Sequence, residues 1–222
     1  MYVMHPNYAP DATHYLRAYS ILQSDLLRLF EFIEPADTNE AAYSYRCLEV
    51  LLRACGEVEA NCKAIFESNG FGIGKQLTMM DYRRLDATHR LSSYQVRLPV
   101  WTGTHAVRHP FANWASASPD WFKAHHGGKH NRHSEFSKAS FGAAVDAVAG
   151  VVALLAAQFI TYDYSPVILR ALEFGDNHGG FEQAIGSYFE VRFPDDWPAD
   201  QRYDFDWQVL RKEEAPFQML SF

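Results

Sequence analysis

Two long segments near the start of the chain repeat residues at alternating intervals of four and three. In residues 11–33 the repeating positions are Tyr15, Tyr19, Leu22, Leu26, Leu29 and Ile33. In the next segment, which extends to about residue 68, they are Ser44, Leu48, Leu51, Cys55, Val58, Cys62 and Ile65. This spacing places side chains along one face of an α-helix. Because only a few residues around Pro35 separate the two helices, we expect them to run antiparallel.

Short polar motifs predict where helices begin. Asp37 with Glu40 three residues later has the spacing of a capping box, which predicts the start of the second helix. Thr78 and Asp81 repeat that spacing and predict a shorter helix that ends near residue 90. The glycine-broken stretch 71–75 superficially resembles a phosphate-binding loop. It lacks the full spacing, the closing Gly-Lys-Ser/Thr and a preceding strand, so we do not assign phosphate binding to it.

Residues 137–162 predict a third long helix that is apolar on almost every face and rich in alanine and glycine. Its longest unbroken apolar run, residues 147–157, has eleven residues. A membrane span needs ~20, so we expect a buried helix and no membrane partner. Small residues allow neighbouring helices to approach closely, and we therefore expect this helix to lie at the centre of the fold.

The remaining segments predict less regular structure. Alternation over residues 94–98 predicts a short strand, and Pro99, Gly103 and Pro110 interrupt the segment after it. Residues 165–175 predict a short helix, and alternation over 188–193 and 203–207 predicts an antiparallel β-hairpin. The predicted fold is mainly α: an antiparallel helical bundle over residues 1–162 with an irregular insertion at 91–136. Residues 163–222 would form a C-terminal α/β appendage that carries the hairpin and packs on the bundle.

Cysteine spacing and overall charge narrow the class of protein. Cys55 and Cys62 would lie ~10 Å apart along one helix, too far for a disulfide, which requires Cα atoms within ~7 Å. With Cys47, they predict reduced, buried thiols. The first six residues show no signal peptide, and together these features predict a cytoplasmic protein. The net charge of −7 argues against a general nucleic-acid coating protein, which would be strongly basic.

Basic charge is concentrated in the middle of the chain. Residues 83–138 carry nine basic and three acidic groups and seven of the ten histidines, whereas residues 163–222 carry five basic and twelve acidic groups. A local excess of positive charge attracts anions. The same excess could instead neutralise the acidic C-terminal segment within one molecule. The sequence leaves both interpretations open.

The densest polar cluster lies between residues 121 and 133. It contains His125, His126, His130, His133, Lys123, Lys129 and Arg132. A native metal site is disfavoured because no cysteine, few carboxylates and no His-Glu-x-x-His pattern accompany the histidines. Gly127-Gly128 would also interrupt the geometry between His126 and His130. We therefore expect neither a metal nor another cofactor.

Phosphate binding is the better interpretation of this cluster. We expect a short helix that opens at residues 118–120 to end at Gly127-Gly128, which would place Lys129–His133 at the N-terminus of the central helix. Free N–H groups there suit a phosphate, Lys129 and Arg132 would add charge-assisted hydrogen bonds, and a histidine can transfer a proton near neutral pH. Alternatively, His130 and Arg132 only tie down a loop through hydrogen bonds to backbone carbonyls.

These residues also carry a resemblance. Trp121-Phe122, then Lys129-His130-x-Arg132, then Phe136 and Ala139 before an alanine-rich helix, resembles a pattern in prokaryotic helical proteins related to the HEPN superfamily. The resemblance covers residues 12–162 and implies a helical bundle that is often dimeric. Many members of the superfamily are metal-independent RNases of toxin or defence systems. In those, an Arg-x(4–6)-His motif supplies a phosphate-binding arginine and a proton-transferring histidine.

This chain departs from the RNase pattern, since Lys129-His130-Asn131-Arg132 is not Arg-x(4–6)-His. One formal match, from Arg84 to His89, lies on a different predicted helix and is expected by chance in a chain with this many arginines and histidines.

The sequence therefore predicts a HEPN-like protein that binds RNA or a nucleotide, as a homodimer. The expected catalytic residues are Arg132, His130 and His133, and the expected ligand-binding residues are Lys129, Lys123, Trp121 and Asn131. The alternative is a non-catalytic interaction protein in which the motif is structural and the aromatic tail docks a partner. Exposure separates the two, because a buried motif with internal partners would favour the structural role.

Overall fold

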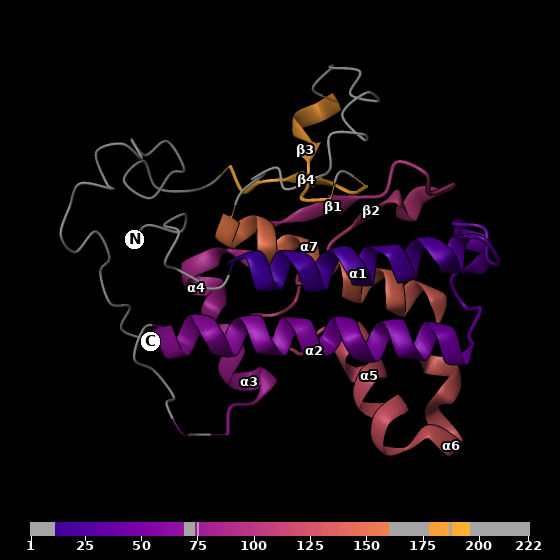
Figure 1. Ribbon diagram of the computed structural model, residues 1–222, viewed down its shortest axis with the longest axis horizontal. Coiled ribbons are helices and arrows are strands. Elements are labelled where there is room, and N and C mark those ends of the chain that lie inside the picture. Colours follow the sequence, from indigo (N-terminus) through magenta and orange to yellow (C-terminus); the bar gives the residue numbers. More distant parts are fainter. Residues whose placement is uncertain (1–11, 69–73, 75, 160–177, 187, 196–222) are drawn as a thin grey trace.

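The computed structural model describes residues 12–68, 74, 76–159, 178–186 and 188–195. Within these residues the chain is mainly helical, with a small antiparallel sheet on one side (Figure 1). The predicted short helix at 165–175 and the second predicted hairpin strand at 203–207 lie outside the described residues.

Helices α1 (Ala12–Phe30) and α2 (Tyr45–Ser68) lie side by side and run antiparallel, as the short connection between them predicts (Figure 1). Their buried residues follow that spacing: Leu16, Tyr19, Leu22, Leu26 and Leu29 on α1, and Leu48, Leu51, Cys55, Val58, Cys62 and Ile65 on α2. All three cysteines are free thiols and buried, as predicted.

Helix α7 (Phe141–Phe159) is the central element and packs against α1, α2 and α5. Its length and composition would suffice to cross a membrane, yet 89% of its apolar window is buried inside the fold. Gly150 shows why small residues are needed: a Cβ there would lie 3.2 Å from the Trp121 ring. The apolar character of α7 is therefore accounted for by its enclosure among other elements.

Short helical segments follow α2. Helices α3 (Met79–Tyr82) and α4 (Asp86–His89) are joined by a 3₁₀ turn, Arg83–Leu85. The predicted capping box is present, with the Asp81 carboxylate accepting a 2.8 Å hydrogen bond from the Thr78 N–H. The capping box predicted at Asp37 and Glu40 is wrong. Asp37 opens only a 3₁₀ turn, Asp37–Asn39, and α2 begins several residues later.

The sheet has the order β2-β1-β4-β3 and joins distant parts of the chain. The strands are β1 (Gln95–Arg97), β2 (Val107–Arg108), β3 (Glu182–Gln183) and β4 (Glu190–Arg192). Val96 pairs with Arg108 on one side and with Val191 on the other. Both valines are fully buried, and β1 and β4 pack against α7.

The predicted strands at 94–98 and 188–193 are thus confirmed. The described strand β4 pairs with β3 and with β1 of the inserted region, a partner that local alternation could not indicate.

Helices α5 (Asp120–His130) and α6 (Arg132–Glu135) lie beside one end of α2 (Figure 1). The prediction that Gly127-Gly128 ends α5 is wrong, because the helix continues through both residues to His130. A Cβ on Gly128 would lie 2.8 Å from Leu48 Cδ1 on α2, and one on Gly127 would lie 3.1 Å from Glu135 Cβ on α6. Here glycine permits close packing and does not stop the helix.

Candidate functional site

The Lys-His-x-Arg motif lies at the junction of α5 and α6. Lys129 and His130 belong to the last turn of α5, Asn131 links the helices, and Arg132 and His133 open α6. The expectation that the motif stands at the N-terminus of the central helix is therefore wrong. A further short turn, η5 (Phe136–Lys138), separates α6 from α7.

The N-terminus of α7 has little left to offer a phosphate. The N–H of Phe141 donates to the Ala42 carbonyl at 2.6 Å, and the N–H of Gly142 donates to the Glu40 carbonyl at 3.0 Å. The N–H of Ala143 donates to Ser140 Oγ at 3.2 Å. These are the groups that a helix leaves unbonded at its start. Because the chain itself bonds them, a phosphate at the motif would be bound by side chains and not by the start of α7.

The motif side chains face solvent. Lys129, His130, Asn131 and His133 are all exposed, and within the described part of the chain none of these side chains forms a hydrogen bond or an ion pair. The side chain of Arg132 lies outside what the structure describes. We call Lys129, His130, Asn131 and His133 the basic cluster. An exposed cluster without internal hydrogen bonds or ion pairs is the arrangement that favours a binding role over a structural one.

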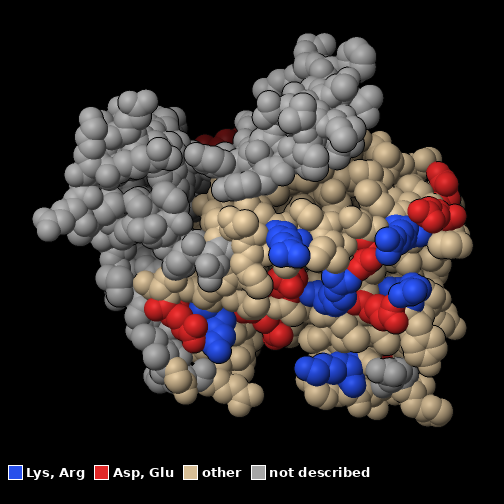
Figure 2. Space-filling model, viewed as in Figure 1, with Lys and Arg blue, Asp and Glu red and all other residues tan. Residues whose placement is uncertain are grey.

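The surface over α1 and α2 provides a contrast. Acidic and basic side chains alternate across it (Figure 2), and they pair: Arg53 with Asp25, and Arg46 with Glu49 at 2.7 Å. Charges on that face neutralise one another locally. Lys123, a predicted ligand-binding residue, is neutralised in the same way: its side chain is exposed, but its Nζ forms an ion pair with Asp120 Oδ1 at 2.7 Å. The basic cluster forms no such ion pair among the described residues.

The histidines in and around the basic cluster differ in their surroundings. His126 and His130 are exposed and lie one helical turn apart, with ring centroids separated by 4.7 Å. His125 is buried beside Phe122, and burial, assisted by the nearby Lys129, lowers its pKa to about 4. His125 is therefore neutral at physiological pH. His89, from the chance match to the RNase motif, is fully buried with its pKa lowered by desolvation to about 3, and cannot reach a polymer outside.

Trp121, another predicted ligand-binding residue, is a packing residue in this structure. Its side chain is 3% exposed, its Nε1 donates to the Pro110 carbonyl at 2.8 Å, and its ring meets Phe111 edge to face. It fixes α5 against α7 across Gly150. One edge of it still borders an open cavity of about 500 Å³ at the start of α7.

That cavity is lined by carboxylates as well as by lysines. Its polar lining consists of Glu40, Asp120, Lys123, Glu135, Lys138, Ser140 and Asp146. Lys138 pairs with Glu135, as Lys123 does with Asp120. Two carboxylates, those of Glu40 and Asp146, therefore need another partner. The basic cluster does not line this cavity.

Arg108 supplies that partner, and no sequence motif pointed to it. Its side chain is 6% exposed, and its Nη1 lies 2.7 Å from Glu40 Oε1 and 3.1 Å from Asp146 Oδ1. The guanidinium lies over the Trp101 ring at 4.2 Å. His105 Nδ1 also lies 2.9 Å from Glu40. The four charged or titratable residues come from three separate segments, so no local motif could reveal the network.

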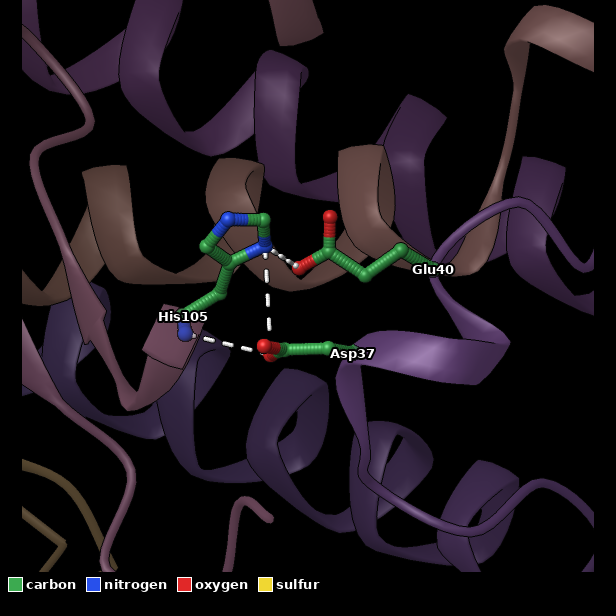
Figure 3. Close-up of side chains that lie close together, drawn as sticks. All are labelled: Asp37, Glu40 and His105. Carbon is green, nitrogen blue, oxygen red and sulfur yellow. Dashed lines mark hydrogen bonds and ion pairs between the residues drawn. The ribbon is translucent and has the colours of Figure 1, made fainter. Parts of the chain in front are cut away.

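Asp37, Glu40 and His105 lie close enough together to suggest a cation site (Figure 3). The Asp37 carboxylate, however, is already saturated. It accepts hydrogen bonds from Trp101 Nε1 at 2.7 Å, from the Thr104 N–H at 2.7 Å and hydroxyl at 2.9 Å, and from the His105 N–H at 3.1 Å. The Trp101 bond contributes most to lowering the pKa of Asp37 far below its usual range. With Arg108 also beside Glu40, this chemistry fits a loop anchor better than a metal centre.

Asp146 makes the network sensitive to pH. Burial raises its pKa to about 6, and Arg108 opposes the shift. An unfolded aspartate has a pKa of ~3.9, so the folded state holds the proton more tightly. The stability that this proton provides is present below pH ~4 and is lost as the pH rises through about 6.

We expect Asp146→Asn, which mimics the protonated acid, to raise the free energy of unfolding at pH 8 by about 1 kcal/mol and by about half as much at pH 5, which lies midway between the unfolded and folded pKa values of Asp146. The figure is reduced for solvent screening, because 37% of the Asp146 side chain is exposed. Urea unfolding at both pH values provides the measurement. Asp120→Asn, on a side chain that is 95% exposed, is the control and should show no such difference. A larger destabilisation by Asp146→Asn at pH 8 than at pH 5 would contradict the assignment.

No family model matches this chain, and neither the curated proteins nor the solved structures contain a match to it.

Proposed function

We propose that this protein is HEPN-like and binds a phosphate-bearing ligand, RNA or a nucleotide, through the basic cluster and Arg132 at the α5–α6 junction. The observation that carries the proposal is the exposure of four neighbouring side chains, Lys129, His130, Asn131 and His133, which form no hydrogen bond or ion pair among the described residues. A motif that served to fix a loop would direct these groups to backbone carbonyls. Polar side chains held at a protein surface without such bonds are available to a ligand.

The arrangement of the helices supports the comparison with HEPN proteins. An antiparallel pair, α1 and α2, packs on a third long helix, α7, and the motif lies shortly before that helix. The acidic net charge of the whole chain does not oppose local binding, because salt screens the electric field of each exposed charge beyond about 8–10 Å. What matters to a phosphate is the charge within that distance.

Binding RNA would release counterions from its backbone, so affinity must fall as salt rises. The test is fluorescence anisotropy with a labelled RNA of about twelve nucleotides over a series of salt concentrations. Lys129→Ala should weaken binding and reduce the slope of log K against log salt by about one. Arg132→Ala should cost about tenfold or more in affinity, and Arg132→Lys much of that, because lysine lacks the bidentate fork.

The matched controls change the same charge elsewhere. Arg28→Ala, on an exposed side chain of α1, should leave RNA affinity unchanged. His14→Ala should also leave it unchanged, and it is the control for His130→Ala, which should weaken binding. If Arg132→Ala lowers the melting temperature and neither it nor the original chain binds RNA, the motif is structural. The non-catalytic interaction protein would then be the better description.

Cleavage is the catalytic extension of this proposal. Arg132 would hold the phosphate, and His130 or His133 would move the proton between the ribose hydroxyl and the leaving oxygen. Incubation of RNA with the protein in the presence of a chelator tests it. Product that appears in the original chain and disappears in His130→Ala or in His133→Ala would support cleavage. Binding without product would limit the role to recognition.

A further inference from the structure

Three aromatic rings form a platform at the surface where α2 begins. Tyr43 is 53% exposed and Tyr45 is 63% exposed, both high values for aromatic residues in a folded chain. Each packs on Phe136, with ring centroids 5.4 Å apart for Tyr43 and 4.7 Å apart for Tyr45. We call Tyr43, Tyr45 and Phe136 the aromatic platform. Each tyrosine ring therefore contacts Phe136 while much of the ring stays open to solvent.

The platform adjoins the basic cluster. Phe136 follows α6 directly and comes three residues after His133. Only Ser134 and Glu135 lie between them, so Phe136 belongs to the turn that closely follows the α5–α6 junction. Tyr43 is held in place by a bridge between its backbone and that of Ser140, which immediately precedes α7. Phe136 of the aromatic platform and the basic cluster thus lie on consecutive segments of the chain, between the end of α5 and the start of α7, and both tyrosines pack on Phe136.

We propose that the aromatic platform stacks an unpaired base of single-stranded RNA while the basic cluster holds the adjoining phosphates, an inference that rests on the proposed function. Stacking on aromatic rings beside positive charge is how proteins bind single strands without reading their sequence. Exposed aromatics alone would suit a protein partner equally well. The neighbouring basic cluster favours a polyanion whose bases are accessible, and bases inside a duplex are not.

The geometry makes Tyr45 the principal stacking residue. It is the more exposed tyrosine, and its ring is tilted by 39° to Phe136, so Phe136 supports it from one side. Tyr43 meets the same ring edge-on, at 86°. A base laid on the free face of Tyr45 would extend the aromatic stack outward. The phenol oxygen contributes nothing to stacking, so phenylalanine should replace Tyr45 without loss.

The experiment compares two labelled single strands of equal length and charge, one of oligouridine and one abasic, by fluorescence anisotropy. Tyr45→Leu should weaken oligouridine binding about tenfold and leave the abasic strand unaffected, and Tyr45→Phe should bind both strands like the original chain. A duplex RNA should show no response to Tyr45→Leu. Phe32→Leu, on a side chain that is 84% exposed but outside the platform, is the control. Circular dichroism melting verifies that each variant is folded.

The outcomes distinguish the two proposals. If both strands bind equally and Tyr45→Leu changes neither, the platform does not stack bases and the phosphate-binding proposal stands alone. If neither strand binds, the proposed function fails and the stacking assignment fails with it. If Tyr45→Leu instead converts a dimer into a monomer by light scattering while RNA affinity is unchanged, the platform is a subunit interface, and the stacking assignment is overturned.

Discussion

Replacing Leu51 with alanine is expected to lower the free energy of unfolding by about 2–5 kcal/mol, whereas the same change at Leu52 should cost about 1 kcal/mol or less. Leu51 is fully buried on the side of α2 that packs against its neighbours, and its removal leaves a cavity as well as losing apolar contacts. Leu52 is the next residue on the same helix but is only partly buried. Both substitutions replace leucine with alanine on the same helix, so they differ only in how deeply the leucine side chain is buried.

Urea unfolding monitored by circular dichroism gives both values. Leu154→Ala tests the same point on α7, where the side chain is also fully buried, and should fall in the same range as Leu51→Ala. Equal losses at Leu51 and Leu52, or a loss below about 1 kcal/mol at both Leu51 and Leu154, would show that the helices do not pack as described.

Replacing Arg108 with alanine is expected to cost about 3 kcal/mol at pH 8. The change leaves Glu40 and Asp146 facing one another with their common cation removed, and breaking a buried ion pair from one side costs about 3–5 kcal/mol. The lower part of that range applies because both carboxylates retain some contact with solvent. Arg53→Ala is the matched control. Arg53 pairs with Asp25 but is 47% exposed, so its loss should be below about 1 kcal/mol.

The same measurement at pH 5 separates electrostatics from packing. Asp146, with its pKa raised to about 6 by burial, is largely protonated there, and one of the two repelling charges is gone. The cost of Arg108→Ala should therefore be smaller at pH 5 than at pH 8. A cost that is the same at both pH values would mean that Arg108 stabilises the fold mainly through its contact with Trp101.

The long helices were predictable because their information is local. The repeated spacing of Leu22, Leu26 and Leu29, or of Leu48, Leu51 and Cys55, specifies a buried face without reference to any other segment. The mainly helical class follows from that spacing, and the central position of α7 follows from its apolar character on almost every face. The sheet was predictable only in part: alternation located β1 and β4 but could not show that they pair, because hydrogen-bond partners 93 residues apart leave no local trace.

The errors at the candidate site have one physical cause: the same residue type can determine local structure or make a contact with a distant part of the fold. Gly127 and Gly128 have the composition of a helix stop but allow α5 to approach Leu48 and Glu135. Asp37 has the position of a helix cap, yet it caps the turn at Thr104, 67 residues away. In each case a contact across the fold determined the conformation. The exposure of the basic cluster was likewise a question that only the structure could address.

The pairing of β1 with β4 has a consequence for the order in which the chain acquires its structure. Helices α1, α2 and α7 and strand β2 are all synthesised before residue 190, so the bundle can assemble while β1 still presents one unpaired edge. Contacts that close long loops form late, and an unpaired strand edge is a template for pairing with another chain. During translation, therefore, the edge of β1 stays open to pairing with another chain from the emergence of α7 until that of β4.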